Sequence, residues 1–315
     1  MLQHSIPEPH APRGATAAAR APAPTTDPLP CWCRRGTWTL VFRTPRFGLL
    51  RCTVCGCYRV DPPPLTSDEG SASFYSDYYV SDHYVAGLPA PSEPAAPRRS
   101  RFWRVAEQVP PVAVAGGLAV DIGCGEGGLC RELANAGWRR VVGLDVSSTR
   151  VARARATYPD LEFFDRPITQ TGLDAEAVEL AVMDNVIEHL PDPVGLLRTL
   201  REFMAPQGRL VVITPNMESG NFRLLGRRWT PELAPHAHVF LFTPPAMRTL
   251  LARAGFVVEA AGTFHTPASS CWPPLGVPRL AELKVMVWRA MQDAGGVYSR
   301  LISAGPMLYA VARRQ

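Results

Sequence analysis

The segment AVDIGCGEGG, residues 119–128, joins a carboxylate to a run of glycines, which is typical of a backbone turn that faces a ligand. Gly123, Gly125 and Gly128 have the G-x-G-x-x-G spacing of a turn that binds the pyrophosphate of a dinucleotide. Asp121 precedes that turn, and its charge would repel a phosphate. S-adenosylmethionine carries an ammonium and a sulfonium but no phosphate, so the sequence favours it over a dinucleotide.

A second acidic residue, Asp145, ends the next apolar run, RVVGLDV. A carboxylate in this position can accept hydrogen bonds from both hydroxyls of a ribose, whichever of the two cofactors is bound. Asp145 therefore predicts a nucleoside-containing ligand, but it does not distinguish S-adenosylmethionine from a dinucleotide.

Short apolar runs alternate with helical patterns from residue 98 onward. Seven strands are expected, at residues 118–123, 140–146, 161–164, 178–185, 208–216, 256–262 and 306–314. Helices are expected at residues 128–138, 147–158, 192–204 and 243–256, with N-caps at Ser147 or Ser148, Asp192 and Thr243. The alternation predicts an α/β fold, with a doubly wound, seven-stranded, mostly parallel sheet that binds ligands at the carboxyl ends of its strands.

Five segments, in this order, resemble the class I S-adenosylmethionine-dependent methyltransferases of the small-molecule branch, which includes ubiquinone-type, sugar and natural-product enzymes. VDIGCGEGGL is similar to the first motif of that family, and VVGLDVS to its acidic second strand. VMDNVIEHLPDP is similar to the fourth-strand motif, GRLVVITPN to the fifth strand, and HVFLFTPPAMRTLLARAGF to a late segment that folds over the substrate cleft. The resemblance covers about two thirds of the chain, roughly from Arg98 to the end.

The resemblance implies a set of cofactor contacts at the carboxyl edge of the sheet. The implied residues are Asp121, Gly123, Gly125, Gly127, Asp145, Asp165, Asp184 and Asn185. The first four would line the methionine end, Asp145 would hold the ribose, and the others are candidates for adenine and amino-group contacts. A tight turn without a ligand is the alternative for the glycines, and an exposed loop carboxylate is the alternative for Asp165.

Five of the eight cysteines fall between residues 31 and 57. Cys52 and Cys55 form a C-x-x-C-G knuckle that can chelate tetrahedral Zn²⁺, and Cys31 and Cys33 lie eighteen residues before it. The segment resembles the zinc-binding module that precedes the methyltransferase domain in many bacterial sugar and natural-product enzymes. One residue rather than two separates Cys31 from Cys33, so Cys57 could replace a ligand, or the thiols could be free. We predict structural zinc on Cys31, Cys33, Cys52 and Cys55.

Composition shifts predict the organisation of the rest of the chain. Residues 1–30 are rich in Ala, Pro and Thr and are expected to form a disordered leader, followed by the zinc module at 31–64. An aromatic segment and a linker at 65–97 lead to the methyltransferase domain at 98–315. Within it, a helical insertion at about 265–303 is expected to pack on the core, to cover the substrate or to form a dimer surface.

Methyl transfer requires an aligned acceptor, and it requires a general base where the acceptor proton has a high pKa. His238 is the first candidate, because the small-molecule branch often has a histidine at the start of a segment like HVFLFT. His189 and His236 are the second and third candidates. A structural, hydrogen-bonded histidine is the alternative in each case, and for His189 it is the favoured one.

The composition limits the function classes. No stretch of 18 apolar residues and no secretory signal is evident, so no membrane span and a cytoplasmic location are expected. The net charge of +5 comes almost entirely from arginine, with Lys284 the only lysine, and is discounted as evidence for nucleic acid. The leading hypothesis is methylation of an oxygen, ahead of a carbon, on a sugar nucleotide, glycan unit or secondary metabolite. An RNA methyltransferase with a basic zinc module and a non-catalytic binding subunit are the alternatives.

Overall fold

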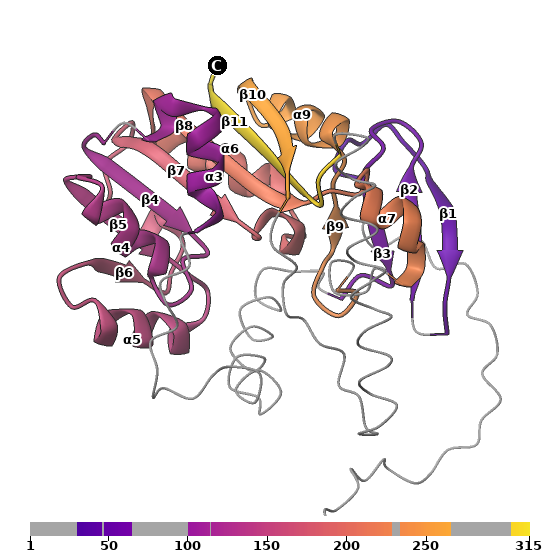
Figure 1. Ribbon diagram of the computed structural model, residues 1–315, viewed down its shortest axis with the longest axis horizontal. Coiled ribbons are helices and arrows are strands. Elements are labelled where there is room, and N and C mark those ends of the chain that lie inside the picture. The colour runs from indigo at the N-terminus through magenta and orange to yellow at the C-terminus, as the bar shows by residue number, and fades with distance from the viewer. Residues whose placement is uncertain (1–29, 46, 65–99, 114, 229–233, 266–303) are drawn as a thin grey trace, which may run out of the picture.

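The computed structural model describes residues 30–45, 47–64, 100–113, 115–228, 234–265 and 304–315 (Figure 1). The expected leader, the aromatic segment with its linker and nearly all of the expected insertion lie outside these residues, as does Cys271. The predictions made for those segments therefore stay predictions.

A seven-stranded sheet forms the centre of the larger part of the molecule. Its order is β10-β11-β8-β7-β4-β5-β6, and β11 runs antiparallel to the other six strands. The strands are β4 (Leu118–Ile122), β5 (Arg140–Leu144), β6 (Glu162–Phe164), β7 (Val178–Asp184), β8 (Met204–Pro215), β10 (Phe256–Phe264) and β11 (Met307–Arg314). The prediction of a doubly wound, mostly parallel sheet is confirmed.

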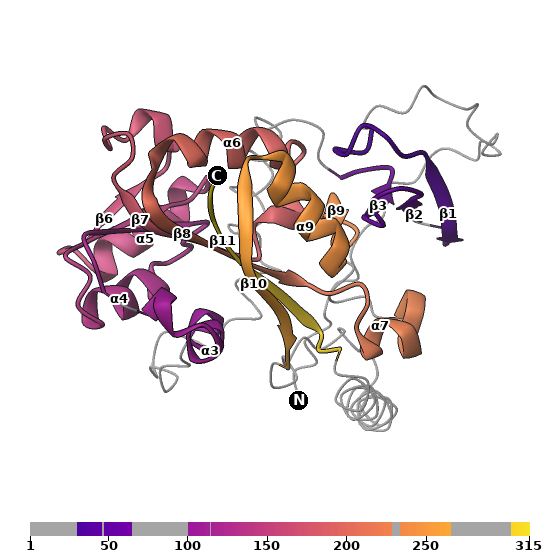
Figure 2. The ribbon, with the colours of Figure 1, turned by 90° about the horizontal axis from the view of Figure 1, so that it is seen from above.

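Helices cover both faces of this sheet, and alternate side chains of each strand contact them. Leu210 and Val212 of β8 pack in the apolar cluster shared with α6 (Pro193–Phe203) and α9 (Pro244–Arg253). Val211 and Ile213 pack in the cluster shared with α3 (Arg101–Gln108), α4 (Gly128–Asn135) and α5 (Ser148–Thr157). Figure 2 shows α6 and α9 on one side of the sheet and α3 and α4 on the other. Because successive side chains of a strand point to opposite faces, the sheet has one apolar core on each face.

The helices are α3 (Arg101–Gln108), α4 (Gly128–Asn135), α5 (Ser148–Thr157), α6 (Pro193–Phe203), α7 (Gly220–Leu225) and α9 (Pro244–Arg253). Four of the helices, α4, α5, α6 and α9, lie close to the expected positions, whereas α3 and α7 were not predicted. Shorter 3-10 turns are η1 (Pro110–Ala113), η2 (Ile168–Gln170), η3 (Ile187–His189) and η4 (Gly226–Arg228). Ser147, Asp192 and Thr243 each cap a helix by accepting a backbone N–H, as expected.

The helix α3 was not predicted from the sequence, and a single carboxylate anchors it to α4. Glu132 accepts hydrogen bonds from the Ser100 backbone N–H at 3.1 Å, from the Ser100 hydroxyl at 2.7 Å and from Trp103 Nε1 at 2.6 Å. Phe102 and Val105 of the same helix are fully buried. These contacts fix α3 beside the carboxyl ends of the central strands.

A second, antiparallel sheet holds the cysteine-rich segment. Its order is β1-β2-β3-β9, from β1 (Trp38–Arg43), β2 (Gly48–Cys52), β3 (Tyr58–Asp61) and β9 (Phe240–Leu241). Its last strand comes from the other end of the chain, because Tyr58 pairs with Leu241 and Arg59 with Phe240. Trp32 and Trp38 also stack on Phe242 and Phe240, with ring centroids 6.4 and 6.5 Å apart. The N-terminal module is therefore joined to the main domain through β9.

Candidate active site and metal centre

The glycine turn after β4 has the backbone conformation that its sequence indicates. Gly123, Gly125 and Gly127 have φ values of +75°, +57° and +83°, in the left-handed region that favours glycine. A Cβ atom on Gly127 would lie 2.7 Å from the Phe163 ring, so a larger residue would not fit there. The backbone N–H groups of Gly123 and Cys124 donate to the Leu144 carbonyl, which places the turn against the end of β5.

Asp145 at that end of β5 is held in place by the turn. One carboxylate oxygen, Oδ2, accepts from the Gly125 N–H at 2.9 Å, and Oδ1 accepts from the Ser147 N–H at 2.9 Å. The residue is buried, at 8% exposure. The carboxylate therefore keeps a fixed orientation beside the glycines, and each oxygen retains a lone pair for a further donor.

Asp121 and Asp184 make this edge of the sheet acidic. Burial raises the pKa of the Asp121 carboxyl well above its usual range, and the charge of nearby Asp184 raises it further. Burial also raises the pKa of Asp184, while the guanidinium of Arg101 lowers it. A ligand that brings positive charge to this edge would stabilise the ionised carboxylates.

Arg101 is a candidate functional residue that the sequence reasoning missed. Its Nε donates to Asp184 Oδ2 at 3.0 Å, and its Nη2 lies 3.0 Å from Oδ1, which makes a two-point ion pair. Asn185, with a φ of +56°, follows Asp184, and its side-chain oxygen can accept from both terminal nitrogens of Arg101 at 3.3 Å. The signal in the sequence was the short amphipathic run RFWRVAEQ, which forms α3.

The structure thus brings most of the predicted cofactor residues to one edge. Asp121, the three glycines, Asp145, Asp184 and Asn185 all stand at or just beyond the carboxyl ends of β4, β5 and β7. Asp165 follows β6 at the same edge but is exposed, and it pairs with Arg155 at 3.9 Å. Val146, which the sequence analysis passed over, is 53% exposed directly after Asp145, so an apolar surface adjoins the acidic one.

Two of the three candidate histidines lie together, and the third does not join them. The rings of His189, in η3, and His238, just before β9, have centroids 4.7 Å apart at an angle of 67°. His189 Nδ1 lies 3.1 Å from the Ala237 carbonyl oxygen. His236 is exposed. The geometry is therefore compatible with His238 and His189 as the first and second candidates for the general base.

Glu188 completes this cluster, and the sequence analysis did not single it out. One carboxylate oxygen of Glu188 and one ring nitrogen from each of His189 and His238 lie within 4.8 Å of one another. Glu188 is fully buried, its Oε2 accepts from the Thr214 hydroxyl at 2.9 Å, and its backbone carbonyl accepts from Val239. Burial raises the pKa of Glu188 to about 7 and lowers the pKa of His189 to about 4. The cluster can therefore exchange protons near neutral pH.

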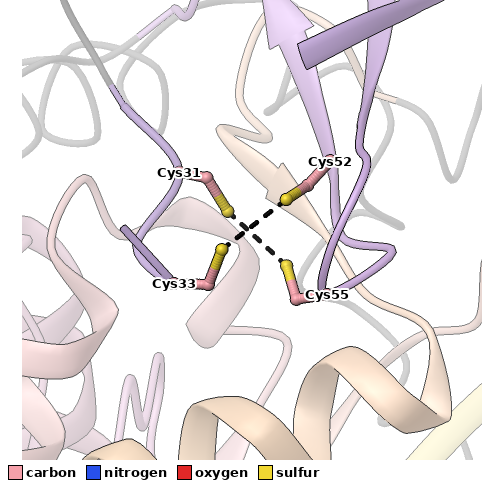
Figure 3. Close-up of side chains that lie close together, drawn as sticks. All are labelled: Cys31, Cys33, Cys52 and Cys55. Carbon is pink, nitrogen blue, oxygen red and sulfur yellow. Dashed lines mark hydrogen bonds between the residues drawn. The ribbon is translucent and has the colours of Figure 1, made fainter. Parts of the chain in front are cut away.

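The four predicted metal ligands converge in the N-terminal module (Figure 3). Cys31 Sγ lies 3.5 Å from Cys55 Sγ, and Cys33 Sγ lies 3.6 Å from Cys52 Sγ, with all four sulfurs within 4.8 Å of one another. A tetrahedral site with zinc–sulfur bonds of about 2.3 Å has sulfur–sulfur edges of about 3.8 Å. The spacing suits a four-thiolate metal site and is too long for disulfides.

Cys57, which the sequence analysis considered as a substitute metal ligand, does not join the four sulfurs. It is fully buried and lies outside the four-sulfur group. Its sulfur accepts from Trp32 Nε1 at 3.4 Å and donates to the Leu241 carbonyl at 3.4 Å. The hydrogen bond with Cys31 lowers the pKa of the Cys55 thiol to about 6, so a thiolate is available at neutral pH. The tight Cys31-x-Cys33 pair is accommodated because each of its members faces a different cysteine of the second pair.

The described residues contain no helix that is both long and apolar enough to cross a membrane. The comparison with families finds that a model described as "Methyltransferase domain" matches residues 97–261. The ubiquinone biosynthesis O-methyltransferase of Cereibacter sphaeroides is 31% identical over 172 residues, with 51% of this chain and 69% of that protein covered. The protein of the same name from Methylobacterium is 33% identical over 175 residues, with the same shares covered.

Two further proteins are similar. A probable S-adenosylmethionine-dependent methyltransferase of Mycobacterium tuberculosis is 32% identical over 149 residues, with 47% of this chain and 52% of that protein covered. The crystal structure of the cyclase SpnF superposes with a TM-score of 0.50 at 18% identity, with 78% of this chain and 97% of that chain covered. At this identity the structural likeness concerns the fold.

The buried, neutral His189 predicts a pH dependence of stability. The unfolded chain takes up a proton at about pH 6.5, whereas the folded chain does so only near pH 4. The stabilisation is complete above pH 6.5 and is lost as the pH falls through 4. At roughly 1.4 kcal/mol per unit of pKa, we expect a loss of about 3 kcal/mol in the free energy of unfolding.

Urea unfolding at pH 4 to 7 would measure this, with His189→Gln expected to show a flatter dependence than the wild type. The raised pKa of Glu188 acts in the opposite direction, with stability lost as the pH rises from 4.5 through about 7, but it acts in both proteins and drops out of the difference. His236→Gln should also flatten the dependence, but less, because burial lowers the pKa of His236 in the same direction as that of His189. Equal slopes for His189→Gln and wild type would contradict the assignment.

Proposed function

This chain belongs to the class I S-adenosylmethionine-dependent methyltransferases, and from that premise we propose that it methylates an oxygen of a small molecule. The observation that carries the proposal is the buried acidic edge beside the glycine turn, next to a cluster of Glu188 and two histidines. The relatives named ubiquinone biosynthesis O-methyltransferase support oxygen as the atom methylated. A sugar nucleotide, a glycan unit and a secondary metabolite are the acceptor classes that we propose.

The residues at the acidic edge fit S-adenosylmethionine. Asp145 has a lone pair on each oxygen for the ribose hydroxyls, and the left-handed glycines place the turn backbone beside that carboxylate. Asp121 and Asp184 suit the ammonium, and the guanidinium of Arg101 suits the carboxylate of the methionine. We propose Val146 as an apolar contact for the adenine. When bound, the cofactor supplies the electrophilic methyl group.

The histidine cluster suits removal of the acceptor proton. We propose that the imidazole of His238 receives the proton of the acceptor hydroxyl while the Glu188 carboxylate, within 4.8 Å, favours the charged ring. His189 stays neutral at pH 7, because burial keeps its pKa near 4. Its ring contacts the His238 ring and so orients His238. His236 remains the third candidate, at an exposed position.

The charge distribution on the module favours this function over RNA methylation. Six arginines between residues 31 and 60 suggested a basic surface. Two of them, Arg43 and Arg59, pair with Asp61 at 3.1 and 3.7 Å, just beyond that segment. Arg59 is also 2% exposed and lies over the Trp38 ring, 4.8 Å from its centroid. These arginines hold the sheet together and are less available to phosphates.

The four-cysteine group fits structural zinc, and we propose that Cys31, Cys33, Cys52 and Cys55 bind it. Nothing but sulfur lies in the ligand set, which is the donor set of structural rather than catalytic zinc sites. The loop that carries these cysteines lies in the same apolar cluster as Phe240 and Phe242, on either side of Leu241 in β9. Metal binding would therefore hold β9, and His238 before it, in position.

A labelling experiment tests the proposed activity. The purified protein is incubated with methyl-labelled S-adenosylmethionine and fractionated bacterial extract, and the label is followed into each fraction. We expect label in the small-molecule pool, and a rate at least about 100-fold lower for Asp145→Ala, because two charge-assisted hydrogen bonds of about 1.5 kcal/mol or more are lost.

The control for this experiment is Asp160→Ala, which removes an exposed carboxylate that pairs with Arg131 and should keep the wild-type rate. Label in RNA would replace the small-molecule proposal by RNA methylation. Cofactor binding without transfer to any fraction would support the non-catalytic alternative.

Metal analysis tests the zinc proposal. We expect one zinc per wild-type chain and none in Cys33→Ser, whose free energy of unfolding should fall by about 4 kcal/mol or more, as measured by urea titration. Cys57→Ser changes a buried neighbour outside the four-sulfur group and should retain zinc. Since Cys33→Ser could fail to fold, release of zinc from the wild type by a thiol-specific mercurial is measured in parallel. A wild-type protein that lacks zinc after metal-replete expression would contradict the proposal.

A further inference from the structure

Arg150, in the first turn of α5, lies across the glycine turn and covers Asp145. Its Nη1 is 3.6 Å from Asp145 Oδ2, and its side chain is 21% exposed. A Cβ atom on Gly125 would lie 2.8 Å from the Arg150 Cζ and would overlap Nη2, so the guanidinium lies directly against the backbone of the turn. The two groups that we expect to face the cofactor, the turn and the carboxylate, are thus in contact with the same cation.

Counting the lone pairs of Asp145 shows why this contact matters. The carboxylate offers two lone pairs on each oxygen, and backbone N–H groups of Ser147 and Gly125 use one on each. The remaining pair on Oδ2 faces Arg150. Two ribose hydroxyls need both remaining lone pairs, and the guanidinium lies 3.6 Å from Oδ2, on the side where one of these hydroxyls would bond.

The burial of Asp145 leads to the same conclusion. Its side chain is 6% exposed, and a ligand can reach it only if a covering group moves. The glycine turn cannot move easily, because its N–H groups are bonded to the Leu144 carbonyl and to Asp145 itself. Arg150 has a long, flexible side chain that is 21% exposed, so it is the covering group that can leave.

Charge balance explains why the guanidinium is there. Asp121, Asp145 and Asp184 are gathered at this edge, and Arg101 and Arg150 are the cations that oppose them. Arg101 is bound at two points to Asp184, so it is fixed, whereas the contact of Arg150 with Asp145 is longer, at 3.6 Å. S-adenosylmethionine would bring its own ammonium and sulfonium to this edge, so the positive charge of Arg150 would no longer be needed there.

We propose that Arg150 is an intramolecular competitor of the cofactor: it occupies Asp145 and the glycine turn in the empty protein, is displaced when S-adenosylmethionine binds, and returns as S-adenosylhomocysteine leaves. This inference rests on the proposed function, because it concerns the same cofactor site. Its consequence is a cofactor affinity below what the other residues of the site would give, and faster release of the product.

Calorimetric titration of Arg150→Met with S-adenosylmethionine and with S-adenosylhomocysteine tests the proposal. Loss of the competitor should lower both dissociation constants by a similar factor, about 5- to 10-fold for one partly buried ion pair. Arg131→Met is the matched control. Arg131 also pairs with an aspartate, the exposed Asp160, which is not a proposed cofactor residue, and its loss should leave both constants unchanged.

Thermal unfolding of the same proteins adds a readout that a merely structural role would not produce. Without cofactor, Arg150→Met should unfold at a lower temperature than wild type, because the acidic edge has lost a cation. In saturating S-adenosylmethionine the variant should recover more than the wild type does, since its binding is tighter. A structural role alone would lower the unfolding temperature equally with and without the cofactor.

Weaker binding by Arg150→Met would mean that the guanidinium contacts the bound cofactor, and unchanged binding would mean that it does not compete. Either result overturns this inference while the proposed function stands. Failure of the wild-type protein to bind S-adenosylmethionine at all would overturn the proposed function together with the inference. Arg150→Gln, which keeps a polar side chain, repeats the titration should Arg150→Met fail to fold.

Discussion

The burial of three carboxylates at the carboxyl ends of β4, β5 and β7 is the constraint on which the rest of the site depends. Such groups are costly in a protein interior unless cations or N–H donors compensate them. The glycine turn gives Asp145 an N–H donor, α3 brings Arg101 to Asp184, and α5 brings Arg150 to Asp145. The position of α3 in turn depends on Glu132 in α4. Helices on one face of the sheet are thus fixed by the charge at its edge.

The second organising element is β9, a strand of two residues. It closes the sheet of the N-terminal module through Tyr58 and Arg59, and it begins two residues after His238. The backbone of Val239 is bonded to both Glu188 and Val60, so the histidine cluster and the module share one segment. A metal on the four cysteines would affect the proposed chemistry through this segment, by fixing its position. The proposed zinc is in this sense a structural support for the proposed general base.

Local sequence patterns were sufficient to predict the sheet, the helix caps and the cysteine group. The apolar run LVVI of β8 and the caps at Asp192 and Thr243 depend on neighbours in the chain, so they can be read from it. The role of Arg101 could not, because it depends on an aspartate 83 residues away. Arg150 is only five residues from Asp145, but its contact depends on how the side chain folds back over the glycine turn. Glu188 was passed over for the same reason, since its significance comes from the packing of η3 against the segment before β9. The pairing of β3 with β9 joins residues about 180 positions apart, which no local pattern indicates.

A crystal structure of the protein with S-adenosylhomocysteine would show directly whether the acidic edge holds the cofactor. We predict that both ribose hydroxyls lie within about 3.2 Å of the Asp145 carboxylate and that the Arg150 guanidinium has left it. Adenosine bound away from Asp145 would contradict the assignment of the acidic edge as the cofactor site. A ribose on Asp145 with Arg150 still in contact would keep the site but contradict the exchange of cations.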